Sequence, residues 1–534
     1  MVRITAYEQR LMRTAITDAE GRYSVGELPA GRYSLNVTRN GYVSLNFGQQ
    51  RAFEPGKPLE LADAQVADKI DFALPRGGVI AGRVTDESGE PIAGVGVRAL
   101  RYQYQPDGRR RLTTVPTGGP FGGGGSTTDD LGQFRIYGLM PGTYVISASI
   151  NPMGGAIAMP MPAGGMNVLN GANDGSDGYA TTYFPGTANE NDAQGIPVNV
   201  GQEAAAFFSL VPARLSRISG VVRNSQGRPA SGVTLGVRMM QPGGIAMGGF
   251  GGTTGPDGSF MLQNITPGEY VLEVRPMGRP GMPGFSAAEA EFALMPITVN
   301  GQDISGLVIT TGLGATVTGR VIFDTTHPAP QGGPVMNAPG QSPRVMFQSS
   351  DPGGMPGMMG MMGMTPDNGV VDASGRFQLT GIAGKGLFRV MNTPSATKSV
   401  MLQGDDITDL PHEVKPGANL EGLEIVLTNL QTTVNGTVRN VRGETVNDYV
   451  VAVFPSNLRE GTNPGRFIRT VRPDQQGNFV TKGLPPADYY AVAIESLEQG
   501  EQWDPAFQDR VRPRAKAFRL NEGQTLSLDL QLMQ

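Results

Sequence analysis

The amino-acid sequence predicts an all-β chain made of tandem β-sandwich modules. Glycine and proline are abundant, with 77 Gly and 41 Pro in 534 residues, and both residues are costly inside helices. Most segments alternate apolar and polar residues over four to eight positions, as half-buried strands do. A motif also recurs at domain-sized intervals along the whole chain. Together these observations favour short strands joined by tight turns.

The recurring motif reads Asp-x-x-Gly-x-aromatic, followed in most copies by Pro-Gly-x-Tyr and an apolar run. The aspartate caps a turn through its side chain, the glycine supplies left-handed backbone, and the aromatic residue adds a large buried ring. The pattern therefore predicts five modules of about 100 residues. The motif glycines lie 102 to 126 residues apart, at Gly21, Gly132, Gly258, Gly375 and Gly477.

A second motif, Gly-x-Val, opens each of the last four modules, at Gly82, Gly220, Gly319 and Gly436. It predicts the following boundaries: 1–76 for a truncated module, 77–213 for a module with Gly/Met-rich loops, 214–312, 313–431 for a divergent module, and 432–534. The first module has no Gly-x-Val strand, so we expect the missing strand and an export signal to lie upstream of Met1. We also expect the modules to form an elongated string of beads.

The segments Gly82–Val97 and Asp129–Val145 together resemble the carboxypeptidase regulatory-like domain, and the resemblance recurs over most of the chain. The resemblance implies an immunoglobulin-like or transthyretin-like β-sandwich that is grouped with carbohydrate-binding-like folds. It also implies an exported, surface or periplasmic protein of environmental bacteria. In such proteins the domain is repeated or attached to peptidases and outer-membrane receptors. The match is weakest in the fourth module, where Ile382–Phe388 departs from Pro-Gly-x-Tyr.

The motifs of several common chemistries are missing from the sequence, and only a pair of carboxylates for glycoside hydrolysis is left open, because the spacing of such a pair is spatial. The chain has no Cys and two His, His327 and His412, and neither belongs to a zinc-peptidase motif. No phosphate-binding loop or nucleophile elbow is present, so we predict no enzyme, no catalytic residue and no cofactor. The net charge of −5 predicts no nucleic-acid partner, and the absence of a long apolar run predicts no transmembrane segment. Asp129-Asp130 and Asp405-Asp406 could bind calcium, but turn capping explains such aspartates equally well.

Two features could carry a specific function. Six methionines of a Gly/Met-rich loop offer soft ligands for Cu(I), an adaptable contact surface, or a plain insertion between strands. These are Met355, Met358, Met359, Met361, Met362 and Met364. Aromatic side chains displayed on a surface could stack on a ligand such as a sugar. The candidates are Tyr102, Tyr104, Tyr179, Tyr183, Phe184 and Trp503.

The leading functional hypothesis is a noncatalytic exported protein that binds carbohydrate or protein at the cell surface or in the periplasm. The alternative is a purely structural spacer, stalk or surface-assembly component, for which self-association is expected. A third reading is the noncatalytic portion of a larger peptidase or outer-membrane receptor. Because the shared residues form turns and cores, any specific function is expected in what the modules do not share.

Overall fold

The computed structural model describes residues 1–6, 11–106, 108, 110–115, 125–150, 177–241, 244–245, 250–275, 291–324, 342–350, 369–393 and 395–533. Within these residues the chain consists of short β-strands grouped into separate sheets, which confirms the all-β sandwich prediction.

The first module contains one sheet, in which β1 lies between β2 and β3. Its strands are β1 (Val2–Ala6), β2 (Leu11–Ala15), β3 (Gly31–Val37), β4 (Leu45–Asn46) and β5 (Leu59–Leu61).

The second and third modules each combine a three-stranded sheet with a larger one. The second comprises β6 (Gly78–Thr85), β7 (Gly96–Tyr104), β8 (Arg110–Thr114), β9 (Gly125–Thr127), β10 (Gln133–Leu139), β11 (Gly142–Ser149), β12 (Asp177–Tyr179), β13 (Thr182–Tyr183), the 3-10 helix η1 (Glu190–Asp192), β14 (Ile196–Val198), β15 (Glu203–Ser209) and β16 (Pro212–Arg214). The third comprises β17 (Ser216–Arg223), β18 (Thr234–Gln241), β19 (Gly244–Ile245), β20 (Phe250–Thr253), β21 (Ser259–Ile265), β22 (Gly268–Arg275), β23 (Glu291–Val299), β24 (Ile304–Thr310) and β25 (Gly312–Leu313).

The fourth module combines a five-stranded sheet with a three-stranded one, whereas the strands of the fifth are joined into one seven-stranded sheet. The fourth comprises β26 (Ala315–Phe323), β27 (Arg344–Ser349), β28 (Arg376–Ile382), β29 (Gly384–Met391), β30 (Ala396–Leu402), β31 (Asp405–Asp406), β32 (His412–Val414) and β33 (Asn419–Thr428). The fifth comprises β34 (Thr433–Arg439), β35 (Val450–Pro455), η2 (Pro464–Arg466), β36 (Arg469–Val471), β37 (Asn478–Lys482), β38 (Ala487–Ile494), η3 (Glu501–Trp503), α2 (Pro505–Val511), η4 (Arg512–Arg514), β39 (Lys516–Leu520) and β40 (Thr525–Met533).

The Gly-x-Val motif lies on a central strand in modules two to five. This strand is β6, β17, β26 or β34, and it pairs antiparallel on one side and parallel on the other. The motif glycine stands directly opposite the aromatic residue of the Gly-x-aromatic motif, as in the pair Gly82↔Phe134. A Cβ atom on Gly82 would lie 1.7 Å from the carbonyl oxygen of Ala206 and 3.1 Å from Phe134 Cε1. The two motifs are therefore two halves of one contact, in which a ring packs over a strand that has no room for a side chain.

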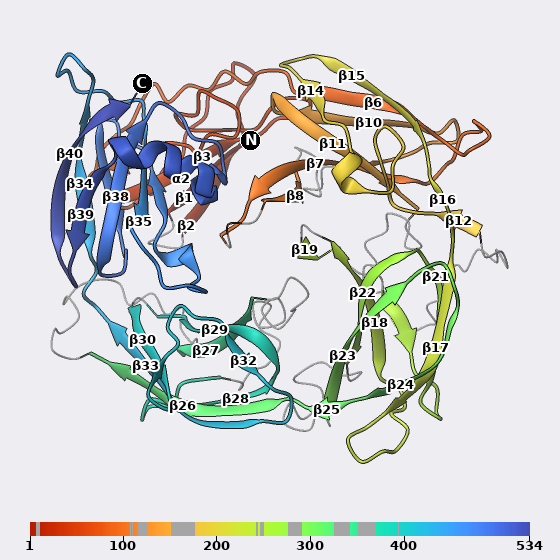
Figure 1. Ribbon diagram of the computed structural model, residues 1–534. Coiled ribbons are helices and arrows are strands. Elements are labelled where there is room, and N and C mark those ends of the chain that lie inside the picture. The colour runs from red at the N-terminus through yellow and green to blue at the C-terminus, as the bar shows by residue number, and fades with distance from the viewer. Residues whose placement is uncertain are drawn as a thin grey trace.

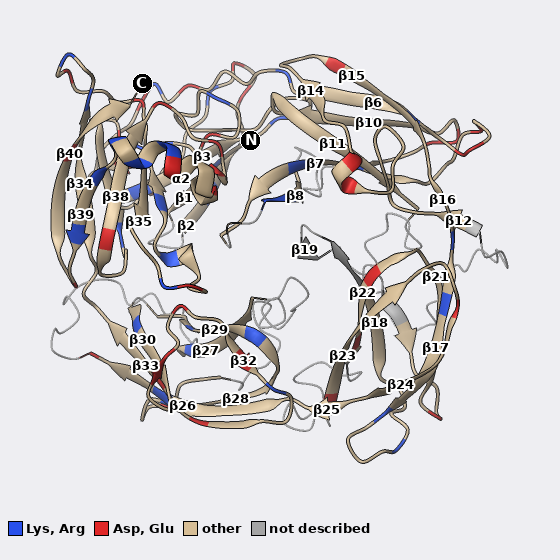
Figure 2. Cartoon of the chain, in the orientation of Figure 1, with Lys and Arg blue, Asp and Glu red and all other residues tan. Residues whose placement is uncertain are grey.

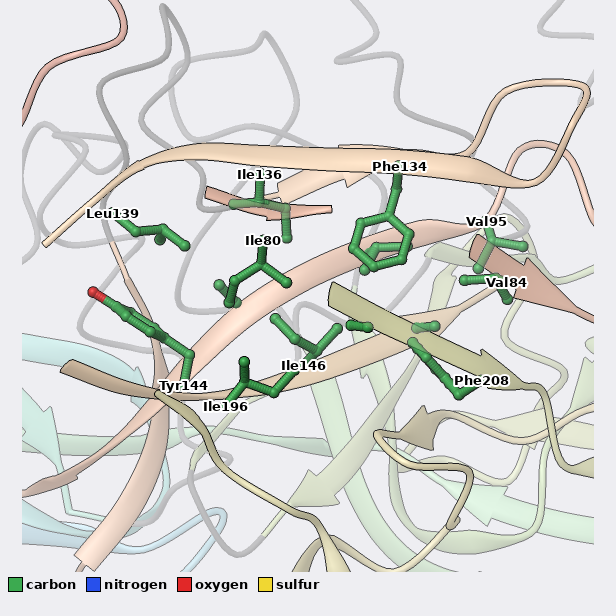
Figure 3. Packing of buried hydrophobic residues seen from close by; sticks show 14 of the residues in the cluster. Ile80, Val84, Val95, Phe134, Ile136, Leu139, Tyr144, Ile146, Ile196 and Phe208 are labelled. Atoms are coloured by element: carbon green, nitrogen blue, oxygen red, sulfur yellow. The ribbon is translucent and has the colours of Figure 1, made fainter. Parts of the chain in front are cut away.

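Each two-sheet module buries its apolar side chains between its sheets. In the second module, Ile80 and Val84 of the central strand lie with Phe134 and Phe208 from the strands on either side (Figure 3). Separate buried clusters occupy the first, third and fourth modules, and the fifth has two.

The tyrosine of Pro-Gly-x-Tyr has a polar role as well as an apolar one. Its ring is buried, and its hydroxyl donates a hydrogen bond to the carbonyl oxygen four residues earlier. The four bonds are Tyr33 to Pro29 at 2.5 Å, Tyr144 to Met140 at 2.5 Å, Tyr270 to Thr266 at 2.8 Å and Tyr489 to Pro485 at 2.6 Å.

The fourth module replaces this tyrosine by a ring from another strand. Gly386 occupies the corresponding place on β29, and a Cβ atom there would lie 2.6 Å from Phe347 Cζ on β27. Phe347 is 3% exposed and packs on Phe388 with ring centroids 5.0 Å apart. The departure from Pro-Gly-x-Tyr is thus compensated within the same core.

The sheet of the fifth module is covered on both faces around β35. Every residue of β35 is buried, whereas a strand such as β10 alternates between buried and exposed residues. The inner residues join the sandwich core, and the outer ones pack against Phe507 and Val511 of α2. A sheet covered on both faces is expected to have such a continuous apolar run.

The modules follow one another around a ring, and the fifth returns to lie beside the first and second (Figure 1). Hydrogen bonds join Arg51 Nη1 to the Glu495 carbonyl oxygen at 3.0 Å and Lys57 Nζ to the Asn447 carbonyl oxygen at 2.5 Å. The expectation of an elongated string of beads is therefore wrong.

Basic and acidic residues are both spread around this ring (Figure 2).

Candidate functional site

The first and last modules meet through a buried ion-pair network. Arg472, which follows β36, is 2% exposed, and its Nη1 lies 2.6 Å from Glu54 Oε1 on the loop between β4 and β5. Glu54 is 3% exposed, and its Oε2 accepts the backbone N–H groups of Gln50 and Arg51 at 3.1 and 3.2 Å. Arg472 Nη2 also donates to Asp448 Oδ1 at 2.5 Å. Charges buried this completely depend on each other, because either alone would carry an uncompensated desolvation cost.

Further polar contacts extend this network toward the surface. Lys57 Nζ lies 3.1 Å from Asp448 Oδ1, so this carboxylate faces cations from both modules. Arg32 Nη1 donates to the Val480 carbonyl oxygen at 3.4 Å. The side-chain amide of Gln475 both donates to and accepts from the backbone of Glu60, each at 3.4 Å. These contacts use the face of the first sheet opposite to the one on which Tyr33 is buried.

Phe53 lies where three modules meet. Its ring lies 3.7 Å from the guanidinium carbon of Arg101 on β7, and its centroid lies 6.4 Å from that of Tyr144 on β11. Arg101 forms an ion pair with Glu498 of the fifth module, and the Gln499 backbone N–H donates to the Phe53 carbonyl oxygen at 3.2 Å. A cation on an aromatic face gains strength when it is desolvated, and Arg101 is 9% exposed. Burial also raises the pKa of Tyr144. We call the contacts that join the first, second and fifth modules the ring junction; they centre on Phe53, Glu54, Arg101, Arg472 and Glu498.

The fourth and fifth modules share a second charged contact. Asp409 Oδ1 lies 3.0 Å from Arg389 Nη2 and 3.5 Å from Arg466 Nη1 of the fifth module. Burial raises the pKa of Asp409, and the two guanidinium groups oppose that shift. Arg466 Nη2 also donates to the Thr397 carbonyl oxygen at 2.9 Å. The fifth module is thus held by ion pairs on both of its neighbours in the ring.

Two of the predicted ligand-contact aromatics form one cluster with Glu190. Tyr102 is half-buried, its hydroxyl donates to the Glu190 carbonyl oxygen at 3.3 Å, and Arg110 lies 4.4 Å from its ring. Tyr183 is 5% exposed. Burial raises the pKa of Tyr183 to about 12, with smaller effects from Glu190 and Tyr102. Burial also raises the pKa of Glu190. These rings pack within the module and offer little free face to a ligand.

The other predicted aromatics are also packed. The rings of Phe184 and Phe208 meet edge to face at 6.0 Å, and Tyr179 packs against the same core while its hydroxyl donates to Glu87 at 3.0 Å. Trp503 packs against the cluster beneath α2. Tyr104 ends β7, which contacts the 3-10 helix that Trp503 ends. The structure therefore brings Tyr104 and Trp503 to the ring junction and leaves the others within the second module.

The Met355–Met364 loop and His327 lie outside the described residues. His412 lies on β32, opposite Gly386. Among the residues that the structure describes, no group of three or more His, Cys, Asp or Glu side chains could hold a metal ion. Asp129 Oδ1 accepts the backbone N–H groups of Leu131 and Gln133, at 3.0 and 2.7 Å, as a turn cap does. No described helix is long and apolar enough to cross a membrane.

A shallow pocket of about 190 Å³ lies beside β38 in the fifth module, lined by residues that include Val492, Lys516 and Asp529. Typical small-molecule sites enclose about 300–1,000 Å³. Lys516 Nζ already donates to the Asp529 carbonyl oxygen at 3.1 Å. We therefore interpret this pocket as a gap between two strands and not as a substrate site.

Sequence reasoning missed Glu54, Phe53, Arg101 and Arg472. Their partners are distant in the chain: Arg472 and Pro55, which also share a hydrogen bond of 3.2 Å, are 417 residues apart. No spacing rule could have paired them. A weak signal was available in residues 51–57, where Arg51, Glu54 and Lys57 surround a phenylalanine in a loop.

Comparisons with known proteins support the fold of one module. Residues 1–74 match the family model of the carboxypeptidase regulatory-like domain. No curated protein sequence matches the chain.

Solved structures similar to this chain include bacterial pilins. A streptococcal ancillary pilin has 13% identity over 56% of this chain and 80% of that chain, with a TM-score of 0.22. The minor pilin GBS52 of Streptococcus agalactiae has 12% identity over 44% and 94%, with a TM-score of 0.21. BcpA, the major pilin subunit of Bacillus cereus, has 10% identity over 85% and 99%, with a TM-score of 0.15. Scores this low carry no inference about function or about how the modules are arranged. The family model, in contrast, matches a defined segment, and it identifies residues 1–74 of this chain as a carboxypeptidase regulatory-like domain.

Proposed function

We propose that this chain is a noncatalytic structural component of an exported surface assembly, built from carboxypeptidase regulatory-like modules in tandem. The observation that carries the proposal is the ring junction. Its buried Glu54–Arg472 pair connects the first module to the fifth, and Arg101 of the second module contacts both Phe53 of the first and Glu498 of the fifth. Such contacts make a rigid platform, whereas an extended stalk would leave these charges and rings in solvent.

The chemistry of the described residues favours a structural role over an enzymatic one. The pocket in the fifth module is small, and Asp409, whose pKa is raised by burial, pairs with Arg389 of its own module and with Arg466 of the fifth. Perturbed pKa values of this kind arise in structural ion pairs as well as in active sites. Export is supported by the family resemblance alone.

Carbohydrate binding is the competing proposal, and it depends on aromatic faces. Tyr183, Phe184 and Trp503 use their rings in packing, which weakens that proposal. A glycan array probed with the intact chain tests it directly. Saturable binding that is lost in a Tyr102→Ala variant, and retained in Tyr137→Ala as an exposed control, would favour carbohydrate binding over assembly.

The assembly role is tested on source cells. We expect mild protease treatment of intact cells to release fragments of this chain, and native electrophoresis of surface extracts to show it in a complex heavier than the monomer. A cytosolic marker controls for lysis. Recovery of the chain only from the cell interior, or only as a monomer, would contradict the proposal.

A further inference from the structure

The second module has an open edge on its three-stranded sheet. The strand order of this sheet is β10–β6–β15, and β15 pairs only with β6 among the strands that the structure describes. Figure 1 shows β15 at the outer border of the module, with β6 between it and β10. One side of β15 therefore faces away from its own sheet.

Hydrogen bonds at the two ends of β15 show which of its residues face this open edge. The Val79 N–H donates to the Gln202 carbonyl oxygen at 2.8 Å, and the Leu210 N–H donates to the Thr85 carbonyl oxygen at 2.9 Å. Successive residues of a strand direct their backbone groups to opposite sides, so the even-numbered residues of β15 bond to β6. The odd-numbered residues direct their N–H and C=O groups to the open edge: Glu203, Ala205, Phe207 and Ser209.

The usable part of this edge is the segment Glu203–Phe207. At one end the chain turns, and the Gln202 N–H donates to the Asn199 carbonyl oxygen at 3.1 Å. At the other end a Cβ atom on Gly186 would lie 3.6 Å from the Ser209 carbonyl oxygen, so the main chain there lies close to the edge. A partner strand can therefore pair with these five residues, whose middle is Ala205.

The corresponding strands of the other modules are protected in ways that β15 is not. In the fourth module β30 covers this side of β33, with which it pairs from Leu423 to Thr428. In the third module the pairing of β24 has a register shift, and its Gly306 has a φ of +74°. In the fifth module β40 carries Asp529 and also pairs with β38. Covering strands, bulges and charges are the means by which edge strands avoid pairing with other chains.

β15 is straight and carries little charge. It pairs with β6 in unbroken register over seven residues. Its only charged residue is Glu203, which already forms an ion pair with Arg135 at 2.9 Å. Ala205 is exposed, and Phe207 is 67% exposed. An edge strand that is straight and exposes apolar side chains is a template for pairing with another chain.

We propose that β15 pairs antiparallel with β15 of a second copy of this chain, about a two-fold axis beside Ala205. A two-fold dimer needs a surface that is complementary to itself, and the open backbone groups are symmetric about Ala205. In this register each Ala205 lies opposite the other, and Glu203 lies opposite Phe207 of the second copy. The exposed Phe207 ring would then lie beside the Glu203–Arg135 pair of that copy, where the guanidinium can contact its face. The two three-stranded sheets would join into one sheet of six strands.

This dimer deepens the proposed assembly role, because it supplies a contact between copies, and it rests on that role only for its place at the cell surface. The contact itself is a property of the purified chain. Its failure in solution would leave the surface assembly to other contacts. Recovery of the chain from the cell interior would contradict the assembly role and leave the dimer standing.

Sedimentation velocity of the full chain at rising concentration tests the dimer. Pairing over five residues is smaller than a standard interface, so we expect a Kd of about 1–100 μM. Phe207→Pro removes one edge-facing N–H from each copy and should weaken the dimer at least about tenfold, since two hydrogen bonds are lost. Proline is tolerated on an edge strand where the N–H is unpaired.

The matched control for this variant is Val308→Pro in the third module. Val308 holds the position on β24 that Phe207 holds on β15, because each lies opposite the residue that follows the motif glycine. Its N–H also faces away from its sheet, since the neighbouring Thr311 and Ile309 are the residues in register to bond with β17. We expect this variant to dimerise as the unmodified chain does.

Single cysteines test the register, because the chain has no Cys of its own. Residues that exchange hydrogen bonds across an antiparallel pair have Cα atoms about 5.5 Å apart, a distance that suits a disulfide. Ala205→Cys should therefore form a disulfide-linked dimer on mild oxidation. Ser209→Cys, which is also exposed, should not, because the two copies of residue 209 would lie about 27 Å apart.

Hydrogen exchange completes the test. Exchange of the amides of residues 203–207 should slow as the protein concentration rises. Protection already present in the dilute monomer would mean that another segment pairs with this edge, and it would overturn the proposal. A chain that stays monomeric well above the expected Kd, equal weakening by the two proline variants, or failure of Ala205→Cys to cross-link would also overturn it.

Discussion

Replacing Arg472 by methionine should open the ring. Arg472→Met leaves Glu54, which is 3% exposed, without its buried cation and with only the half-exposed Arg51 guanidinium, 3.8 Å away. Removing one partner of a buried ion pair costs about 3–5 kcal/mol. That cost lowers the closure equilibrium constant by a factor of roughly 100 to 4,000, since each 1.4 kcal/mol is tenfold.

Small-angle scattering measures the opening directly. If each module of ~100 residues has a radius of gyration of about 13 Å, five modules in a ring give roughly 30 Å and five in a line give roughly 50 Å. The chain contains no Cys, so Asn40→Cys and Arg442→Cys, both at exposed positions, can carry a distance-reporting pair of labels across the junction. We expect Arg472→Met to increase the radius of gyration and to broaden the distance distribution.

Two further variants separate the charge effect from a general loss of stability. The double variant Glu54→Leu, Arg472→Met removes both buried charges and should remain closed, because apolar replacement of a buried pair is often neutral. Arg320→Ala breaks an exposed pair with Glu424, whose side chains are 58% and 46% exposed, and should change nothing measurable. A closed ring in Arg472→Met, or equal opening in the double variant, would refute the reasoning.

Three other predictions concern single modules. Gly436→Val should destabilise the fifth module by more than about 2 kcal/mol in urea unfolding, because a Cβ atom would lie 1.8 Å from the Leu528 carbonyl oxygen. Gly312→Val on β25 is the control for a glycine replacement on a strand, because nothing lies within 4 Å of its Cβ, and equal effects would contradict the packing explanation. Phe507→Ala should cost about 3–5 kcal/mol by uncovering the outer face of β35, and a loss below ~1 kcal/mol would mean that α2 contributes little. Burial raises the pKa of Tyr489. Above about pH 10 the folded state therefore keeps a proton that the unfolded state has lost, and the free energy of unfolding should fall as the pH rises further. Absorbance at 295 nm during alkaline titration checks this, because ionisation of all 14 tyrosines near pH 10 in a folded chain would exclude the effect.

Much of the fold could be predicted because its signals are local. The Asp-x-x-Gly turn is closed by contacts within five residues, as when Asp474 Oδ1 accepts the backbone N–H groups of Gln476 and Asn478 at 2.9 and 2.8 Å. The pairing of motif glycine with motif aromatic was not predicted, although both motifs were visible in the sequence. The module boundaries and the upstream strand remain predictions.

The candidate site was predicted less well, because exposure depends on neighbours that no local pattern reveals. Tyr183 looked available for ligand contact by sequence, but its surroundings include Tyr102 and η1, and it is 5% exposed. The Met355–Met364 loop stays a prediction outside the described residues. Apart from the charged loop at residues 51–57, the ring junction gave no signal, since its partners lie far apart in the sequence.

The sequence by itself determined the strands, the turns and the composition of each core, because these depend on residues a few positions apart and on alternation along a strand. Only the tertiary structure decided that the chain closes on itself. Closure depends on the angles between successive modules, and small rotations at each link add up over the whole chain. The pairs that depend on this closure, Glu54 with Arg472 and Arg101 with Glu498, join the fifth module to the first and the second, so they form only when the chain has returned to its starting point.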